Sequence, residues 1–202
     1  MTVYAAYFSP TGNSRKAALA IASGISNDVK ELDFTRFGAA PECSFASDDI
    51  IVIAAPVYKG RVYEGAIERF SALKGPAYCI AAVTYGNRAY DDALLELVSF
   101  MKAQDFDVIS ATAVVGQHTY GNIQKGRPDS ADAEALRCFG KASYESIGKG
   151  GELYVPGSYP YREGGDGGNF TPLTGDGCVS CGLCVRQCPV GAIGDDCRTI
   201  DS

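Results

Sequence analysis

Two uninterrupted apolar runs, Ile50–Ala55 and Ala77–Thr84, constrain the fold of this chain most strongly. A strand carries apolar residues at successive positions when both of its faces are buried, which is typical of parallel sheets covered by helices. Segments of helical periodicity alternate with such runs through the first 150 residues of the 202-residue chain. The alternation predicts βαβ units and an α/β fold.

The pattern gives a definite set of expected elements. Strands are expected at Val3–Phe8, Asp28–Phe34, Ile50–Ala55, Ala77–Thr84 and Val108–Val115. Helices are expected at Ser14–Ser23, Tyr63–Ser71, Asp91–Ala103 and Ser130–Gly148. Asp91 or Asp92 is expected to cap the third helix, and Asp129 or Ser130 the fourth. Five such strands predict a doubly wound, five-stranded parallel sheet.

The character of the sequence changes after residue 148. Gly, Pro and Tyr are frequent up to Gly177, and no periodicity remains. We therefore expect a first domain over residues 1–150, a connector over 151–174 and a small C-terminal segment over 175–202. The connector is expected to pack on the first domain through its aromatic residues, with a flexible tether as the alternative. These aromatic residues are Tyr154, Tyr159, Tyr161 and Phe170.

The charge of the chain excludes several classes of partner. Its formal net charge is −6, whereas nucleic acids and anionic membrane surfaces attract basic faces. No apolar run approaches the roughly 20 residues that span a bilayer, and no signal peptide is visible. A cytoplasmic protein is expected, and no feature predicts its oligomeric state.

The loop between the first strand and the first helix has the composition of a phosphate site. It offers hydroxyls, an amide and a glycine at the start of a helix, where free N–H groups and the helix dipole favour an anion. The candidate ligands are Ser9, Thr11, Gly12, Asn13 and Ser14. Without a lysine in the loop, the composition favours a phosphate monoester held by neutral donors. The alternative is that the hydroxyls only cap the helix.

Two later loops also follow strands and can converge on the same ligand. The candidates are Pro56, Val57, Tyr58, Lys59 and Gly60 after the third strand, and Thr84, Tyr85, Gly86, Asn87 and Tyr90 after the fourth. With the S-P-T-G-N-S loop, these segments resemble the FMN-binding loops of flavodoxins. The resemblance implies bound FMN, with Tyr58 and Tyr85 beside the isoalloxazine ring. Arg61 and Arg88 are either charge partners of a reduced flavin or of a protein, or plain surface charges.

The strongest short motif lies near the end of the chain, where four cysteines occur at the spacing C-x2-C-x2-C-x3-C-P. They are Cys178, Cys181, Cys184 and Cys188. Bacterial ferredoxins bind [4Fe–4S] clusters with this spacing. Zinc is the weaker alternative, because structural zinc sites usually use two separated pairs.

Taken together, the chain resembles the flavodoxin–ferredoxin fusion proteins of anaerobic microbes, cut short. In two-cluster ferredoxins the fourth cysteine of such a run ligates the other cluster. By this resemblance, the cluster could be absent from this chain or incompletely ligated, with Cys188 or Cys197 supplying the fourth ligand.

Three functions are compatible with these features. The favoured one is an electron carrier that passes electrons between FMN, a [4Fe–4S] cluster and redox protein partners. The second is an FMN-dependent reductase of a small molecule, with a pocket near His118 and Tyr120. His118 is either a proton donor at the flavin edge or a loop histidine with a structural hydrogen bond. The third is a non-redox binding module on a flavodoxin-like fold.

Overall fold

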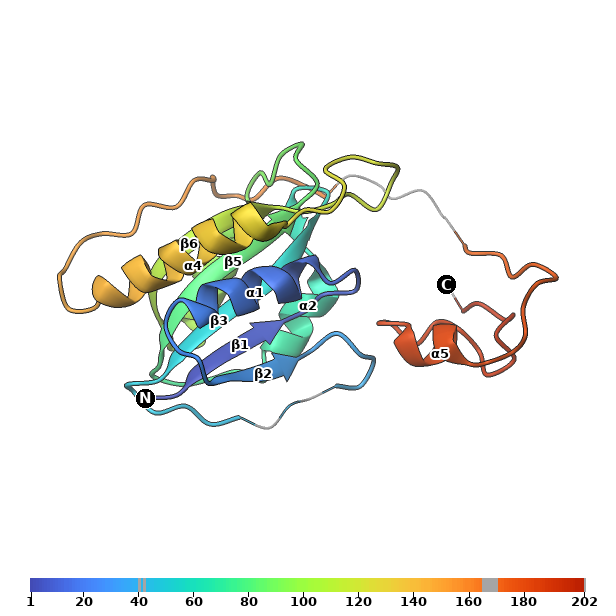
Figure 1. Cartoon of the computed structure of the whole chain (residues 1–202), viewed down its shortest axis with the longest axis horizontal. Coiled ribbons are helices and arrows are strands. Elements are labelled where there is room, and N and C mark those ends of the chain that lie inside the picture. Colours follow the sequence, from blue (N-terminus) through green and yellow to red (C-terminus); the bar gives the residue numbers. More distant parts are fainter. Residues whose placement is uncertain (40, 42, 165–170, 202) are drawn as a thin grey trace.

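A computed structural model describes residues 1–39, 41, 43–164 and 171–201. Five parallel strands form the sheet in the order β2-β1-β3-β5-β6 (Figure 1). They are β1 (Val3–Tyr7), β2 (Val29–Asp33), β3 (Ile50–Tyr58), β5 (Tyr78–Tyr85) and β6 (Asp107–Val115). This order reverses between β1 and β3, as in flavodoxin-type sheets, where ligands bind at the reversal. The predicted fold class is confirmed.

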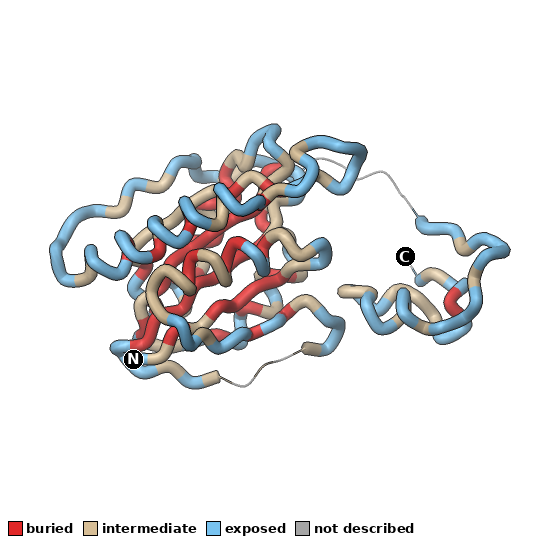
Figure 2. Tube along the Cα trace, in the orientation of Figure 1, coloured by how far each residue is buried: buried red, intermediate tan, exposed pale blue. Residues whose placement is uncertain are grey.

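Helices cover both faces of the sheet. Helices α1 (Asn13–Ser23) and α4 (Ser130–Glu145) pack on one face, over side chains such as Val52 and Ala54. Helices α2 (Glu64–Phe70) and α3 (Ala93–Ala103) pack on the other, over Ile51 and Ile53. Figure 2 shows the buried residues concentrated along the central strands. Full burial of a Val or Ile side chain such as these stabilises the fold by about 1.5–3 kcal/mol. Within the described residues, no helix is long and apolar enough to cross a membrane.

Several short elements escape the sequence pattern. Strand β4 (Arg61–Val62) pairs antiparallel with the end of β3 and closes a two-residue turn at Lys59 and Gly60. In the C-terminal segment, α5 spans Leu183–Gln187, and one isolated bridge joins Ile193 to Ile200. Elements of two to five residues show no periodicity, so the sequence does not reveal them.

The two predicted helix caps differ in outcome. Asp129 caps α4, because its carboxylate accepts hydrogen bonds from the N–H groups of Ala131 and Asp132. Asp92 occupies the N-cap position of α3, but its side chain makes no capping hydrogen bond there. It instead accepts hydrogen bonds from the connector, so its predicted role as a cap is wrong.

The connector lies on the first domain, and of the described aromatic residues expected to pack there, Tyr161 does so whereas Tyr154 and Tyr159 do not. Tyr154 and Tyr159 are 85% and 83% exposed. Leu153 and Val155 pack against the core instead. Tyr161 is half-buried beneath the Arg61 guanidinium, which lies 4.9 Å from the ring centroid. Phe170 lies outside the described residues.

Candidate functional site

A pocket of about 410 Å³ opens at the carboxyl ends of β1, β3 and β5. Its volume falls within the roughly 300–1,000 Å³ of small-molecule sites. All three predicted loops contribute to its wall, as the parallel topology requires. The predicted residues that line it are Thr11, Asn13, Pro56, Val57, Tyr58, Lys59, Thr84, Tyr85 and Gly86.

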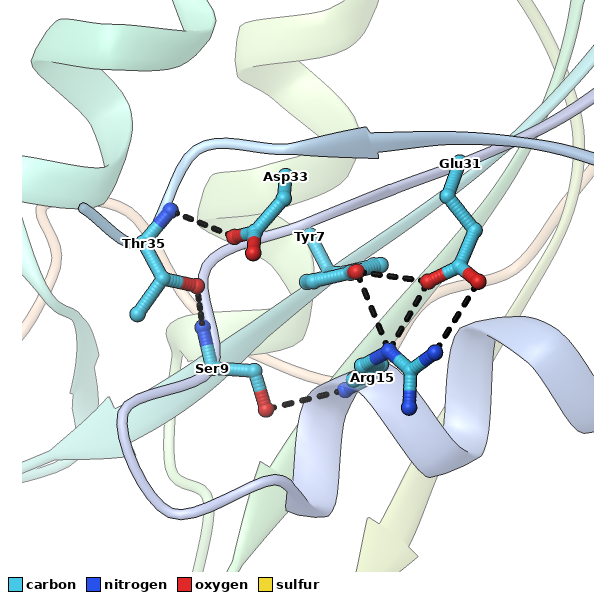
Figure 3. Close-up of polar contacts among 6 residues, drawn as sticks. All are labelled: Tyr7, Ser9, Arg15, Glu31, Asp33 and Thr35. Atoms are coloured by element: carbon cyan, nitrogen blue, oxygen red, sulfur yellow. Dashed lines mark hydrogen bonds and ion pairs between the residues drawn. The ribbon is translucent and has the colours of Figure 1, made fainter. Parts of the chain in front are cut away.

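The predicted phosphate loop, residues 9–14, is held by the loop after β2 (Figure 3). The N–H of Ser9 donates to Thr35 Oγ1 at 2.9 Å, and the N–H of Thr35 donates to Asp33 Oδ1 at 2.8 Å. The Ser9 hydroxyl accepts from the N–H of Arg15 at 2.9 Å. Ser9 therefore fixes the shape of the loop and does not line the pocket.

An ion pair behind the loop ties α1 to β2 (Figure 3). Arg15 donates to both carboxylate oxygens of Glu31, at 2.8 and 2.9 Å, and the Tyr7 hydroxyl donates to the same carboxylate at 2.6 Å. Hydrogen bonds from Arg15 and Tyr7 lower the pKa of Glu31, and the one from Arg15 has the larger effect. Burial, followed by the bond to Glu31, raises the pKa of Tyr7 to about 12. The charge of Arg15 is thus neutralised by Glu31, outside the pocket.

Two contacts tie the predicted phosphate loop to its neighbours. The Ser14 hydroxyl, 1% exposed, lies 2.7 Å from Thr84 Oγ1 at the end of β5. The Asn13 amide donates to the Gln117 carbonyl at 2.9 Å. Ser14 therefore joins two predicted flavin loops internally, while Asn13 reaches a segment after β6.

That segment, residues 117–120, also lines the pocket. Sequence reasoning considered a pocket near His118 and Tyr120 but missed Gln117 and Thr119. The lining residues are Gln117, His118, Thr119 and Tyr120. A Cβ on Gly86 would lie 2.1 Å from His118 Cδ2, so only glycine admits the imidazole there. His118 Nδ1 accepts from the N–H of Tyr120 at 2.9 Å, which is the structural hydrogen bond considered above. The segment follows a parallel strand, and that position was the available signal.

The other predicted residues occupy positions outside the lining of the pocket. Gly12 lies at the start of α1, and Gly60 lies in the β3–β4 turn. The Tyr90 ring packs on Tyr85, with centroids 5.4 Å apart. Asn87 is exposed and has a positive φ of 65°. None of Ser9, Gly12, Ser14, Gly60, Asn87 and Tyr90 is among the described residues that line the pocket.

The charged groups near the site also differ from expectation. An adjoining hollow of about 310 Å³ shares Thr11 and Asn13 with the pocket and adds Lys16 and Arg127. Asp132 compensates the charge of Arg127 through an ion pair, so Lys16 is the residue that adds positive charge beside this loop. Arg61 forms a two-pronged ion pair with Glu96, at 2.5 and 2.9 Å, so its charge is compensated within the chain. Arg88 is exposed.

The cysteine segment presents thiols and backbone N–H groups together. The N–H of Ser180 donates to Cys178 Sγ at 3.4 Å, and the N–H of Ala192 donates to Cys188 Sγ at 3.3 Å. Burial alone would raise the pKa of Cys188, but the backbone N–H groups of residues 190–193 outweigh it and lower the pKa. Sulfur ligands that accept N–H bonds suit an iron–sulfur cluster.

The four predicted cysteines are not drawn together around one point. Across the described residues, no three His, Cys, Asp or Glu side chains gather as a metal site. Cys197 is 2% exposed, and burial raises the pKa of its thiol. The Gly182 N–H opposes this shift, and the neighbouring thiols of Cys184 and Cys178 add to it. The ligand set therefore stays a prediction.

Comparisons with known proteins address the two parts of the chain separately. Residues 175–194 match a family described as a 4Fe-4S binding domain. The fold is similar to the flavodoxin, WrbA-like protein from Agrobacterium tumefaciens, with 16% identity and a TM-score of 0.51 over 71% of this chain and 94% of that chain. It is also similar to rubredoxin oxygen:oxidoreductase from the anaerobe Desulfovibrio gigas, with 16% identity and a TM-score of 0.50 over 73% of this chain and 37% of that chain.

No curated protein sequence matches the chain. Identities this low establish the fold alone, because one fold hosts many functions. The chain thus joins a flavodoxin-like fold to a segment that matches a 4Fe-4S binding domain.

Proposed function

We propose that this chain is an electron-transfer flavoprotein that passes electrons between FMN, a [4Fe–4S] cluster and external redox proteins. The observation that carries the proposal is the combination, in one chain, of a pocket at the strand-order reversal and a segment that matches a 4Fe-4S binding domain. Its parts are an FMN domain over residues 1–150, a connector over 151–174 and an iron–sulfur segment over 175–202. Cysteine thiolates require a reducing compartment, which favours the cytoplasm.

In this proposal, the residues of the pocket bind and orient the flavin. The phosphate would lie against Thr11 and Asn13, the loop residues that line the pocket, at the positive end of the α1 dipole. Tyr58 and Tyr85, from the ends of β3 and β5, would flank the ring. Residues 117–120 would shield it from water on the side of β6. When bound, FMN supplies one- and two-electron chemistry and the cluster supplies one-electron chemistry.

The C-terminal segment would hold the cluster through the thiolates of Cys178, Cys181, Cys184 and Cys188. A matched pair of variants tests this assignment, because Cys138 is exposed on α4, far along the chain from the motif. After anaerobic reconstitution, Cys184→Ser is expected to lose most bound iron and sulfide, whereas Cys138→Ser retains both. Wild-type protein that binds flavin but no iron would contradict the cluster half of the proposal. Protein that binds neither would favour a non-redox binding module.

A reductase of a small molecule is the second candidate function. The pocket extends beyond the predicted flavin loops to His118 and Tyr120, and Tyr120 is exposed. A small substrate could reach the flavin beside these side chains. Steady turnover of a quinone or dye with a nicotinamide nucleotide, reduced at least tenfold by His118→Ala, would favour this reading over an electron carrier.

A further inference from the structure

The turn that follows β3 is covered by Asp91, which precedes α3, and by Arg162 of the connector. Gly60 has a φ of +82°, and a Cβ there would lie 2.4 Å from Asp91 Oδ2 and 2.7 Å from Arg162 Cδ. Asp91 and Arg162 form an ion pair at 2.7 Å. The turn that carries Tyr58 and Lys59 into the pocket is therefore packed directly beneath this ion pair.

The connector is held over the turn by a buried carboxylate. Asp92 is 7% exposed and accepts hydrogen bonds from the N–H groups of Ser158, at 2.9 Å, and Arg162, at 2.7 Å. Both hydrogen bonds lower the pKa of Asp92, and the one from Arg162 has the larger effect. Hydrogen bonds to an ionised acceptor are roughly twice as strong as neutral ones. Asp92 thus fixes both ends of the connector segment 158–162.

Arg61 joins the same segment to the turn itself. Its guanidinium donates to the Arg162 carbonyl at 3.2 Å and lies over the Tyr161 ring. Glu96 of α3 holds the guanidinium and also accepts from the N–H of Val62 at 2.9 Å. The turn, α3 and the connector therefore form one cluster of contacts.

We propose that residues 158–162 are a strap that holds the turn at residues 58–61 in the shape that binds flavin. Asp92 and Arg162 are then positioning residues, since neither lines the pocket. A loop that is already ordered pays less conformational entropy when its ligand binds, so the strap raises affinity without touching the ligand. The identity of that ligand as FMN rests on the proposed function.

The test compares Asp92→Ala and Arg162→Met with a control, Arg137→Met. Arg137 lies on α4 and pairs only with exposed Glu134 among the described residues. FMN affinity is measured by flavin fluorescence, and hydrogen exchange by mass spectrometry of peptides covering residues 56–63 and 158–162 in the chain without added FMN. We expect Asp92→Ala and Arg162→Met to weaken FMN binding roughly three- to tenfold and to accelerate exchange at residues 56–63. The control is expected to change neither.

The two readouts separate this proposal from the proposed function. Exchange at residues 56–63 that stays at the wild-type rate in both variants overturns the strap. Accelerated exchange with unchanged affinity, in a chain that binds FMN, overturns the positioning role. Accelerated exchange in a chain that binds no FMN supports the strap and overturns the proposed function. Arg162→Met removes the ion pair with Asp91 but keeps both backbone hydrogen bonds to Asp92. If Asp92→Ala fails to fold, Arg162→Met therefore still tests the strap.

Discussion

Tyr7 illustrates how much of the site depends on residues that never face the pocket. Its hydroxyl donates to Glu31, which also holds Arg15 at the start of α1. Deprotonation of the phenol would remove the donor and place a negative charge beside a carboxylate. For this reason the environment of the folded protein favours the neutral phenol.

The titration of Tyr7 is the first prediction. Burial and Glu31 raise its pKa from 10.0 to about 12 in the folded protein. A raised pKa means that Tyr7 contributes stability that is fully present below pH 10.0 and is lost as the pH rises through about 12. The difference in tyrosinate absorbance between wild type and Tyr7→Phe is expected to develop near that upper value. A difference that develops near pH 10.0 would contradict the buried hydrogen bond.

At the scale of elements, the β3–β4 turn is sensitive to any added atom. Gly60→Ala places a methyl group against Asp91 and Arg162, in addition to the left-handed backbone cost of roughly 1–2 kcal/mol. Gly38 has a similar φ of +74° but no heavy atom within 4 Å of its would-be Cβ. Urea denaturation should therefore show a larger loss of stability for Gly60→Ala than for Gly38→Ala. Equal losses would mean that the residues above the turn move aside for the added methyl group without loss of stability.

The elements that sequence reasoning placed correctly are those whose burial leaves a pattern of apolar residues in the sequence. Continuous apolar runs identify β3 and β5, and helical spacing identifies α1 and α3, because burial on given faces dictates the pattern. The β3–β4 turn has no period, but its place after a strand predicts its part in the pocket. The contribution of Gln117 and Thr119 appears only in three dimensions. The role of Asp92 depends on Ser158, a partner 66 positions away. No local pattern encodes such a contact, and the rule for helix caps therefore gave the wrong role.

At the scale of the whole molecule, Arg69 of α2 joins the cysteine segment to the first domain. Its guanidinium donates to the carbonyls of Phe34, at 2.8 Å, and Thr35, at 2.9 Å, and also to that of Pro189. Figure 1 shows the segment that carries α5 on the side toward which the β1 and β2 arrows point. The pocket is lined from the carboxyl ends of β3 and β5 in the same parallel sheet. Arg69 thus links the turn after Cys188 to the loop that supports Ser9.

Removing the Arg69 guanidinium should loosen the attachment of the cysteine segment to the first domain. Hydrogen exchange at residues 188–193 is expected to be faster in Arg69→Met than in wild type, because methionine cannot donate to the Pro189 carbonyl. Arg137→Met again provides the control. The global stability of both variants, measured in urea, distinguishes local release from general unfolding. Unchanged exchange at residues 188–193 would show that other contacts hold the segment.

The central claim is that one chain holds a flavin and an iron–sulfur cluster that exchange electrons. The most direct measurement is an anaerobic reductive titration of the reconstituted protein, followed by its visible spectrum. We expect flavin bands and a broad iron–sulfur absorbance to bleach together, with uptake of about three electrons per chain. Uptake of about two electrons with flavin bands alone, or no bleaching at all, would contradict the claim.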